Sequence, residues 1–96
     1  MVWRLQALAD HNRLRILDAL RNGERCVCRL TESLHMGQPL LSHHLKVLRE
    51  AGLVSGRKDG RWVHYSVIPD ALSEIETLLA GIREDAVSAE PLLDQC

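Results

Sequence analysis

The feature that most constrains the fold is a pair of short helical segments followed by a hairpin signal. Residues 26–35 and 38–51 are expected to form helices, with a glycine between them. Pro39 opens the second helix, where its missing N–H removes no hydrogen bond. Asp59-Gly60 then separates two β-prone, alternating segments, which is typical of a hairpin. Two helices joined by a tight turn and followed by a hairpin predict a winged helix-turn-helix.

The segments on the N-terminal side add two more helices. Residues 2–9 predict a first short helix, and Asp10 is a suitable N-cap for a second helix that ends at Asn22-Gly23. The expected apolar face of this second helix consists of Leu14, Leu17 and Leu20. The sequence therefore predicts a mainly α fold with one β-hairpin, as a single domain over residues 1–90 with a C-terminal tail over residues 91–96.

The last helix is expected to begin at Pro69-Asp70 and to pack along another helix. Its apolar residues recur in alternating steps of three and four, at Leu72, Ile75, Leu79, Ile82, Ala86 and Ala89. In so short a chain we expect this helix to pack on a second copy of the chain, with the N-terminal helix also contributing to the interface. Packing on the chain's own core is the alternative. The predicted dimer contacts are Leu5, Leu8, Leu72, Ile75, Leu79 and Ile82.

Composition excludes several classes of protein. The chain has 96 residues and only three aromatic side chains, so its core must consist mainly of Leu, Ile, Val and Ala. No apolar run approaches the roughly 20 residues that span a bilayer, and no secretory signal opens the chain, so we expect a cytoplasmic protein without membrane contact. Three cysteines, an odd number, favour reduced thiols over a disulfide framework.

Charge is distributed unevenly along the chain. The net charge is −1, but residues 1–37 carry +2, residues 38–65 carry +3 and residues 66–96 carry −6. The positive part coincides with the predicted helix-turn-helix and hairpin, and an ordinary mixed surface with an acidic tail is the alternative. This distribution favours double-stranded DNA as the partner of residues 1–90, which are then a DNA-binding and dimerisation domain.

The exposed face of the second helix of a helix-turn-helix enters the major groove, with its N-terminal residues nearest the bases. We expect Gln38, Ser42 and His43 to reach base edges and His44 and Lys46 to reach phosphate. The hairpin cations Arg57, Lys58 and Arg61 suit phosphate or minor-groove contact. The alternatives are solvated histidines and a solvated hairpin tip.

Two thiols, Cys26 and Cys28, lie at the expected start of the helix over residues 26–35, beside Arg25 and Arg29. Cations and helix N-termini lower the pKa of a thiol, and the thiolate is the form that binds soft metals. A two-residue step in an α-helix places side chains about 200° apart, so both sulfurs would reach one ion only if the first turn unwound. This conflict predicts a switch in which binding distorts the helix. Two buried structural cysteines are the alternative.

These motifs together resemble the ArsR/SmtB family of bacterial metal-sensing repressors, and the arsenic-responsive branch within it. The similar segments are Ala9–Leu17, Cys26-Val27-Cys28, Gln38-Pro39, Ser42–Val54 and Gly60–Tyr65. The resemblance implies a winged-helix homodimer on an inverted-repeat operator, released by As(III) or Sb(III) at Cys26 and Cys28. Trivalent arsenic prefers three sulfurs, and Thr31 stands where this branch often has its third cysteine. Cys96, a small thiol or hydroxide would then complete the shell.

Other functions remain as alternatives. Oxidation or persulfidation of the same cysteines would make the protein a redox-responsive repressor. A thiol enzyme is disfavoured, because a Cys-X-X-Cys motif before a helix in an α/β fold is missing, and we expect no enzymatic activity. None of the five histidines lies on the last helix, so a zinc site of the kind that the resemblance suggests there is not expected.

Overall fold

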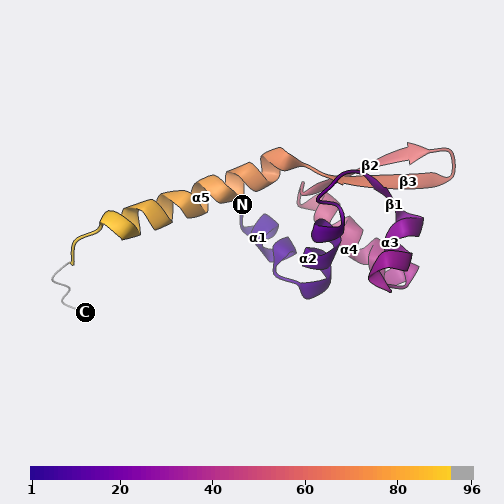
Figure 1. Cartoon of the computed structure of the whole chain (residues 1–96), viewed down its shortest axis with the longest axis horizontal. Helices are drawn as coiled ribbons and strands as arrows, with labels where there is room; N and C mark the ends of the chain where they lie inside the picture. The colour runs from indigo at the N-terminus through magenta and orange to yellow at the C-terminus, as the bar shows by residue number, and fades with distance from the viewer. Residues whose placement is uncertain (92–96) are drawn as a thin grey trace.

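The structure, a computed structural model, describes residues 1–91 and confirms a mainly helical fold with one hairpin (Figure 1). The predicted tail residues 92–96, Cys96 included, lie outside the described residues. The elements in chain order are α1 (Val2–Leu8), α2 (His11–Ala19), β1 (Arg25–Cys26), α3 (Val27–Leu34), α4 (Gln38–Glu50), β2 (Val54–Asp59), β3 (Trp62–Val67) and α5 (Pro69–Ser88).

The helix-turn-helix consists of α3 and α4. Helix α3 ends one residue earlier than predicted, because His35 takes the left-handed conformation (φ 51°) that closes the helix. Gly37 is the N-cap of α4 and not the end of α3. The side chains of Leu41, Leu45 and Leu48 are buried on one face of α4, which fixes the opposite face toward solvent.

The hairpin β2–β3 is the wing, and its turn is shifted by one residue from the prediction. Asp59 pairs with Trp62, so the two-residue loop is Gly60-Arg61 and not Asp59-Gly60. Gly60 has a φ of 63°, which the first position of a type II′ turn requires and which a residue with a Cβ rarely adopts. The short strand β1 was not predicted; it pairs antiparallel with β3 and gives the sheet order β1-β3-β2.

The core lies where α2, α3, α4 and the base of the wing meet. Ile16, Leu30, Leu53 and Val54 are almost completely buried there together with the α4 leucines. The predicted apolar face of α2 is wrong in one residue, since Leu14 is 51% exposed and Ile16 takes the core position.

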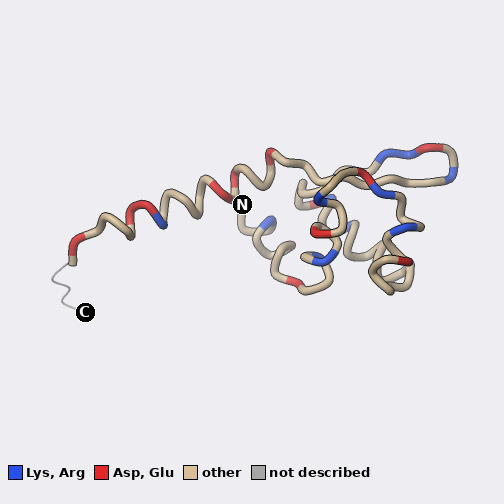
Figure 2. The backbone as a smooth tube through the Cα atoms, viewed as in Figure 1, with Lys and Arg blue, Asp and Glu red and all other residues tan. Residues whose placement is uncertain are grey.

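Helix α5 extends away from the rest of the fold (Figure 1) and carries most of its described charges as acids (Figure 2). Its first turns pack on the chain's own core through Ala71 and Ile75. The prediction that Ile75 contacts a second copy is therefore wrong, because the side chain is only 6% exposed in the single chain. The other predicted dimer residues divide into Leu5, Leu8 and Leu72, partly buried against the core, and Leu79 and Ile82, exposed.

Arg4 ties α1 to two other helices. Its Nε donates to the carbonyl oxygen of Ala51 at the end of α4 (2.9 Å), and its guanidinium pairs with Glu74 on α5. Within residues 1–91, no helix combines the length and apolar character needed to cross a membrane.

Candidate functional site

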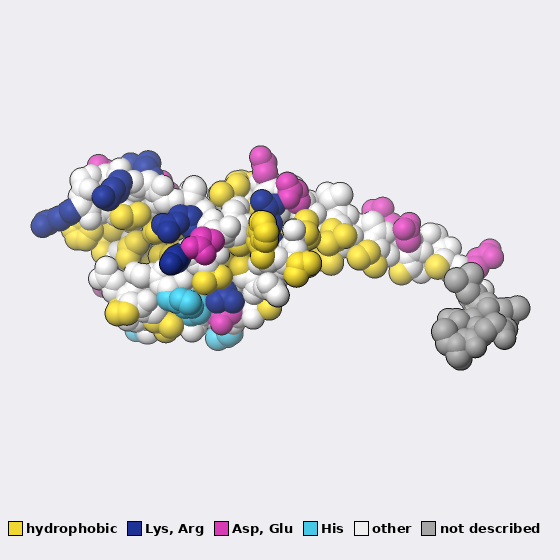
Figure 3. Space-filling model, turned by 180° about the vertical axis from the view of Figure 1, so that it is seen from behind, with side chains coloured by type: hydrophobic (Ala, Val, Ile, Leu, Met, Phe, Trp, Pro, Cys, Tyr) yellow, Lys and Arg dark blue, Asp and Glu magenta, His cyan; other side chains and the backbone are white. Residues whose placement is uncertain are grey.

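The exposed face of α4 presents the side chains that the sequence predicted to contact DNA. Gln38, Ser42, His43 and Lys46 are all exposed, because the buried leucines hold the opposite face in the core. Leu40 is also exposed on this helix. On the wing, Arg57, Lys58 and Arg61 are exposed, and Lys and Arg side chains gather at this end of the molecule (Figure 3). These cations lie apart from the acidic surface of α5.

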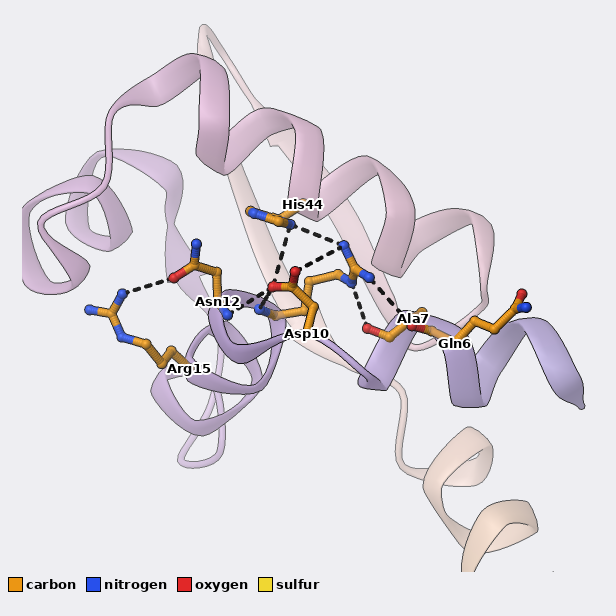
Figure 4. A network of polar contacts seen from close by, with 7 residues as sticks. Gln6, Ala7, Asp10, Asn12, Arg15 and His44 are labelled. Carbon is orange, nitrogen blue, oxygen red and sulfur yellow. Dashed lines mark hydrogen bonds and ion pairs between the residues drawn. The ribbon is translucent and has the colours of Figure 1, made fainter.

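His44 is the exception, and its predicted contact with phosphate is wrong. The side chain is buried and points from α4 toward the junction of α1 and α2 (Figure 4). There the Nη1 group of Arg13 donates to His44 Nδ1 (3.2 Å), and the Asp10 carboxylate lies 4.0 Å away from the same nitrogen. The accepting Nδ1 makes this imidazole neutral, with its proton on Nε2.

Arg13 joins three segments at this junction. Its Nε donates to the carbonyl oxygen of Ala7 (2.6 Å) and its Nη2 to that of Gln6 (3.3 Å), both on α1, while Asp10 accepts from the backbone N–H groups of Asn12 and Arg13 as the N-cap of α2. Asp10 was predicted only as a helix cap, and the role of Arg13 was not predicted. The sequence pattern that could have predicted this ion pair is an arginine three residues after the capping aspartate, a spacing that places the cation over the carboxylate.

Burial of His44 predicts a stability that depends on pH. Desolvation lowers the pKa of His44 below 6.5, with the charges of Arg13 and His43 acting in the same direction and that of Asp10 against it. The unfolded chain therefore binds this proton at higher pH than the folded chain. The stabilisation is complete above the unfolded pKa of 6.5 and is lost as pH falls through the lowered pKa.

We expect the urea midpoint to fall more steeply between pH 7 and pH 5 for the unsubstituted chain than for His44→Gln, whose amide keeps an acceptor for Arg13 without titrating. The exposed neighbour His43→Gln is the matched control and should leave the slope nearly unchanged. Parallel pH profiles for the unsubstituted chain and His44→Gln would contradict this origin of the pH dependence.

The two thiols lie in contact at the start of α3, and Cys28 belongs to the first turn of that helix. Cys26 is not helical: it is the N-cap of α3, with an extended backbone (φ −69°, ψ 144°). The Cys28 thiol donates to the Cys26 sulfur at a distance of 2.7 Å, and the backbone N–H of Cys28 points at the same sulfur (3.4 Å). The prediction that the sulfurs meet only if the first turn unwinds is therefore wrong, since they are in contact while α3 stays intact.

The contact separates the acidities of the two thiols. The hydrogen bond from Cys28 lowers the pKa of Cys26, and the backbone N–H groups of α3 and the charge of Arg29 act in the same direction. The same hydrogen bond raises the pKa of Cys28. The charge of Arg25 is not among the causes of the lowered pKa of Cys26, contrary to the prediction, and its Nε donates to the carbonyl oxygen of Ala19 (2.9 Å). Cys26 is half-buried and Cys28 exposed, so the alternative of two buried structural cysteines is wrong.

The thiol segment belongs to the same sheet as the wing. Arg25 pairs with Tyr65 and Cys26 with His64 of β3. Next to them Glu24 accepts two hydrogen bonds from Arg57 of β2 (2.6 and 3.1 Å), which lower the pKa of Glu24. Two nitrogen atoms of Arg57, a predicted DNA contact, are thus paired with a carboxylate, which partly neutralises the charge that this side chain offers to a phosphate.

A groove of about 520 Å³ brings one of the two thiols, Cys28, together with the DNA-facing residues. It lies between α3, α4 and the wing, and its lining includes Cys28, Gln38, Ser42, Lys46 and Arg61. Thr31 lines it as well. Among residues 1–91, no three His, Cys, Asp or Glu side chains are arranged to hold a metal ion, so this part of the chain offers a soft ion two sulfurs.

Comparisons with known proteins agree with this geometry. The family model described as bacterial regulatory protein, arsR family, matches residues 10–55. The chain is 42% identical to the arsenic resistance transcriptional regulator ArsR1 of Pseudomonas putida over 80% of its own length and 61% of that protein, so it spans less than two thirds of this relative. It is 40% identical to the arsenical resistance operon repressor of Staphylococcus aureus, over 77% of this chain and 75% of the repressor.

Among solved structures, the chain resembles the homodimeric winged helix-turn-helix DNA-binding domain of a possible ArsR-family transcriptional regulator from Mycobacterium bovis. The TM-score is 0.71 and the identity 26%, over 97% of this chain and 86% of that one. The helix-turn-helix, the wing and these similarities lead to one assignment. The chain belongs to the ArsR family of bacterial regulatory proteins, which are winged helix-turn-helix transcription regulators and not enzymes.

Proposed function

We propose that this chain is a cytoplasmic, homodimeric repressor that binds an inverted-repeat operator and is released from it by As(III) or Sb(III) bound at Cys26 and Cys28. The observation that carries the proposal is the contact between the two sulfurs, 2.7 Å apart, at the edge of a groove lined by DNA-facing side chains. The arsenic-related names of two relatives support this choice of inducer.

The DNA step uses α4 and the wing. Gln38, Ser42 and His43 are exposed on α4 and carry donors and acceptors that match base edges in the major groove. Lys46, Lys58 and Arg61 supply positive charge for phosphate, which makes binding strongly dependent on salt. His44 does not contact DNA in this proposal. It helps to orient the DNA-facing side of α4, since its contact with Arg13 fixes the rotation of α4 relative to α1 and α2.

The inducer step uses the thiols. Soft thiolate ligands select soft ions, and the lowered pKa of Cys26 favours its thiolate. The sulfurs start in contact, so a single ion bridges them with little rearrangement of α3. Leu79 and Ile82, exposed on α5, are the proposed dimer contacts that bring two such units to the two halves of an operator.

The coupling between the two steps follows from proximity. An ion on Cys28 lies in the wall of the groove that Gln38, Ser42 and Lys46 share. An ion on Cys26 acts on β1, which is paired with β3 of the wing. Release needs a coupling free energy of only about 1–3 kcal/mol, or roughly a 5- to 150-fold loss of operator affinity.

A mobility-shift titration with operator DNA tests this proposal. We expect arsenite to lower the operator affinity of the unsubstituted chain by about tenfold or more. Cys26→Ser is expected to bind the operator as tightly but to stay bound in arsenite. Cys96→Ser, which removes the third thiol of the chain, shows whether release by arsenite needs the Cys26–Cys28 pair alone. Normal release of Cys26→Ser by arsenite would refute the role of Cys26.

The same thiol contact favours a second candidate, a redox-responsive repressor. A thiolate hydrogen-bonded to a neighbouring thiol is arranged for oxidation followed by disulfide formation. A peroxide and a polysulfide arm added to the same titration separates the two candidates. Release by either oxidant but not by arsenite would replace the metal-responsive proposal with the redox one.

A further inference from the structure

The groove beside Cys28 is positively charged and holds no acid. Lys46, Arg49 and Arg61 line it together with Trp62, and its lining includes no Asp or Glu. Lys46 is partly engaged, because its Nζ lies 4.0 Å from a Glu50 carboxylate oxygen, whereas no ion pair within residues 1–91 involves Arg49 or Arg61. The guanidinium of Arg61 lies 5.5 Å from the centre of the Trp62 ring, which positions it at the groove wall.

The volume and polarity of the groove suit a small molecule. At about 520 Å³ it falls within the usual range of ligand sites, which is roughly 300–1,000 Å³. The hydroxyls of Thr31 and Ser42 and the amide of Gln38 add hydrogen-bonding groups between the cations. Such a lining recognises carboxylates, because guanidinium groups bind them with two parallel hydrogen bonds.

The sulfur pair next to this groove leaves trivalent arsenic one ligand short. Cys26 and Cys28 supply two sulfurs, and no third His, Cys, Asp or Glu joins them within residues 1–91. Thr31, which also lines the groove, supplies no sulfur, and its hydroxyl donates to the Cys28 carbonyl oxygen (2.9 Å). Cys28 is exposed and is itself one of the residues that line the cationic groove.

We infer that a small thiol bearing carboxylate groups occupies the groove between α3, α4 and the wing and completes the arsenic shell with its own sulfur. This inference rests on the proposed binding of As(III) at Cys26 and Cys28. The thiol's carboxylates lie against Arg49 and Arg61, and its sulfur becomes the third ligand. The effector is then a ternary complex of the protein, the ion and an anionic thiol.

The chemistry balances without an oxidant. Arsenous acid carries three hydroxyl groups, and each is exchanged for one thiolate as an As–S bond replaces an As–O bond. The thiol protons leave with the hydroxyls as three waters, and arsenic stays trivalent. Two of the thiols come from Cys26 and Cys28 and one from the small molecule.

The ternary complex also gives a direct route to release. Its anionic part lies beside Gln38, Ser42, Lys46 and Arg61, the side chains proposed to face DNA. Carboxylates there neutralise cations that would otherwise contact phosphate and repel the DNA backbone. An anionic thiol therefore makes arsenite a stronger inducer than arsenite with a neutral thiol.

Native mass spectrometry of the full-length chain with arsenite and competing thiols tests the inference. Reduced glutathione is the anionic probe, 2-mercaptoethanol the neutral one and cysteamine the cationic one, all at equal thiolate concentration. The quantity measured is the ratio of the ternary complex with glutathione to that with 2-mercaptoethanol. The double variant Arg49→Gln/Arg61→Gln calibrates the intrinsic preference of arsenic for each thiol. Arg83→Gln on α5 is the matched control for loss of an arginine.

We expect the ratio to be about tenfold higher for the unsubstituted chain than for the double variant, equivalent to about 1.4 kcal/mol. Cysteamine is expected to be disfavoured, and added salt should reduce the preference for glutathione. Arg83→Gln should keep the ratio of the unsubstituted chain.

Equal ratios for the unsubstituted chain and the double variant would overturn the inference. A binary complex of protein and arsenic that forms without any added thiol and is lost in Cys96→Ser would overturn it too, because Cys96 would then supply the third sulfur. Arsenic binding that is unchanged in Cys26→Ser would instead refute the proposed function itself.

Discussion

Replacing Arg13 with alanine is expected to lower the free energy of unfolding by about 3 kcal/mol. The guanidinium, only 15% exposed, donates to the carbonyl oxygens of Ala7 and Gln6 and to His44 Nδ1. Its removal leaves these acceptors and the Asp10 carboxylate without their cationic partner at the junction of α1, α2 and α4. Chemical denaturation followed by circular dichroism measures the loss.

The matched control is Arg21→Ala, which removes an arginine from an ion pair with Asp18 whose side chains are more than 70% exposed. An exposed pair contributes roughly 0–1 kcal/mol, so this variant should stay near the unsubstituted chain. Arg13→Lys is expected to be nearly as destabilised as Arg13→Ala, since an ammonium group lacks the fork that reaches α1 and α4 together. Similar midpoints for Arg13→Ala and Arg21→Ala would show that the network contributes little.

The operator affinity of Arg13→Ala should fall as well, at temperatures where the variant remains folded. The network determines how α4 is rotated over α1 and α2, and a small rotation displaces Gln38 and Ser42 from the base edges. Such a loss appears as reduced discrimination between operator and random DNA, because the phosphate contacts depend less on the rotation.

The architecture was predictable because its signals are local. The apolar spacing of Leu41, Leu45 and Leu48 fixes one face of a helix, and Asp59-Gly60 marks a reversal between two strands. The hairpin turn was nevertheless misplaced by one residue, since local composition identifies a turn more readily than its register. The type II′ turn needs its glycine at the first loop position, which moves Asp59 into β2.

The thiol geometry was not predictable from periodicity. Helical spacing would separate Cys26 and Cys28. Cys26, however, lies in strand β1, where it pairs with His64 of β3, and it is the N-cap of α3 and not part of that helix. That pairing joins residues nearly forty positions apart, so nothing in the local sequence reports it. The presence of a thiol pair could be recognised from sequence, whereas the contact between the sulfurs required the tertiary structure.

The burial of individual side chains was the second property that the sequence pattern did not predict correctly. His43 and His44 are neighbours in sequence, yet α4 turns the first toward solvent and the second toward Arg13. Ile75 and Leu79 lie one turn apart on the same seam, yet only Ile75 reaches the chain's own core before α5 extends away from it. In both cases a regular pattern crosses from the core to the surface at a point that only the packing defines.

The change from buried to exposed along α5 leads to the second prediction of large effect. The double variant Leu79→Glu/Ile82→Glu is expected to be monomeric in sedimentation equilibrium and to lose about 100-fold or more in operator affinity. Burial of each such side chain contributes about 1.5–3 kcal/mol, and two-fold symmetry counts each twice. Four buried carboxylates would add a desolvation penalty to this loss.

The monomer should keep its fold, because Leu79 and Ile82 are 55% and 61% exposed in the single chain. Unchanged helical circular dichroism therefore separates loss of assembly from loss of structure. Glu84→Lys, a charge change on the other side of α5, is the matched control and should remain dimeric. A dimeric double variant would exclude the outer face of α5 from the interface.

Salt dependence makes the result specific to assembly. A dimer bound to two half-sites neutralises twice as many phosphates as a monomer bound to one, and the slope of log affinity against log salt follows that number. The monomeric variant should therefore show about half the slope of the unsubstituted chain, whereas a defect within the DNA-binding surface would weaken binding without dividing the slope by two. The slope thus distinguishes a repressor that needs its second copy from one that has only lost contacts.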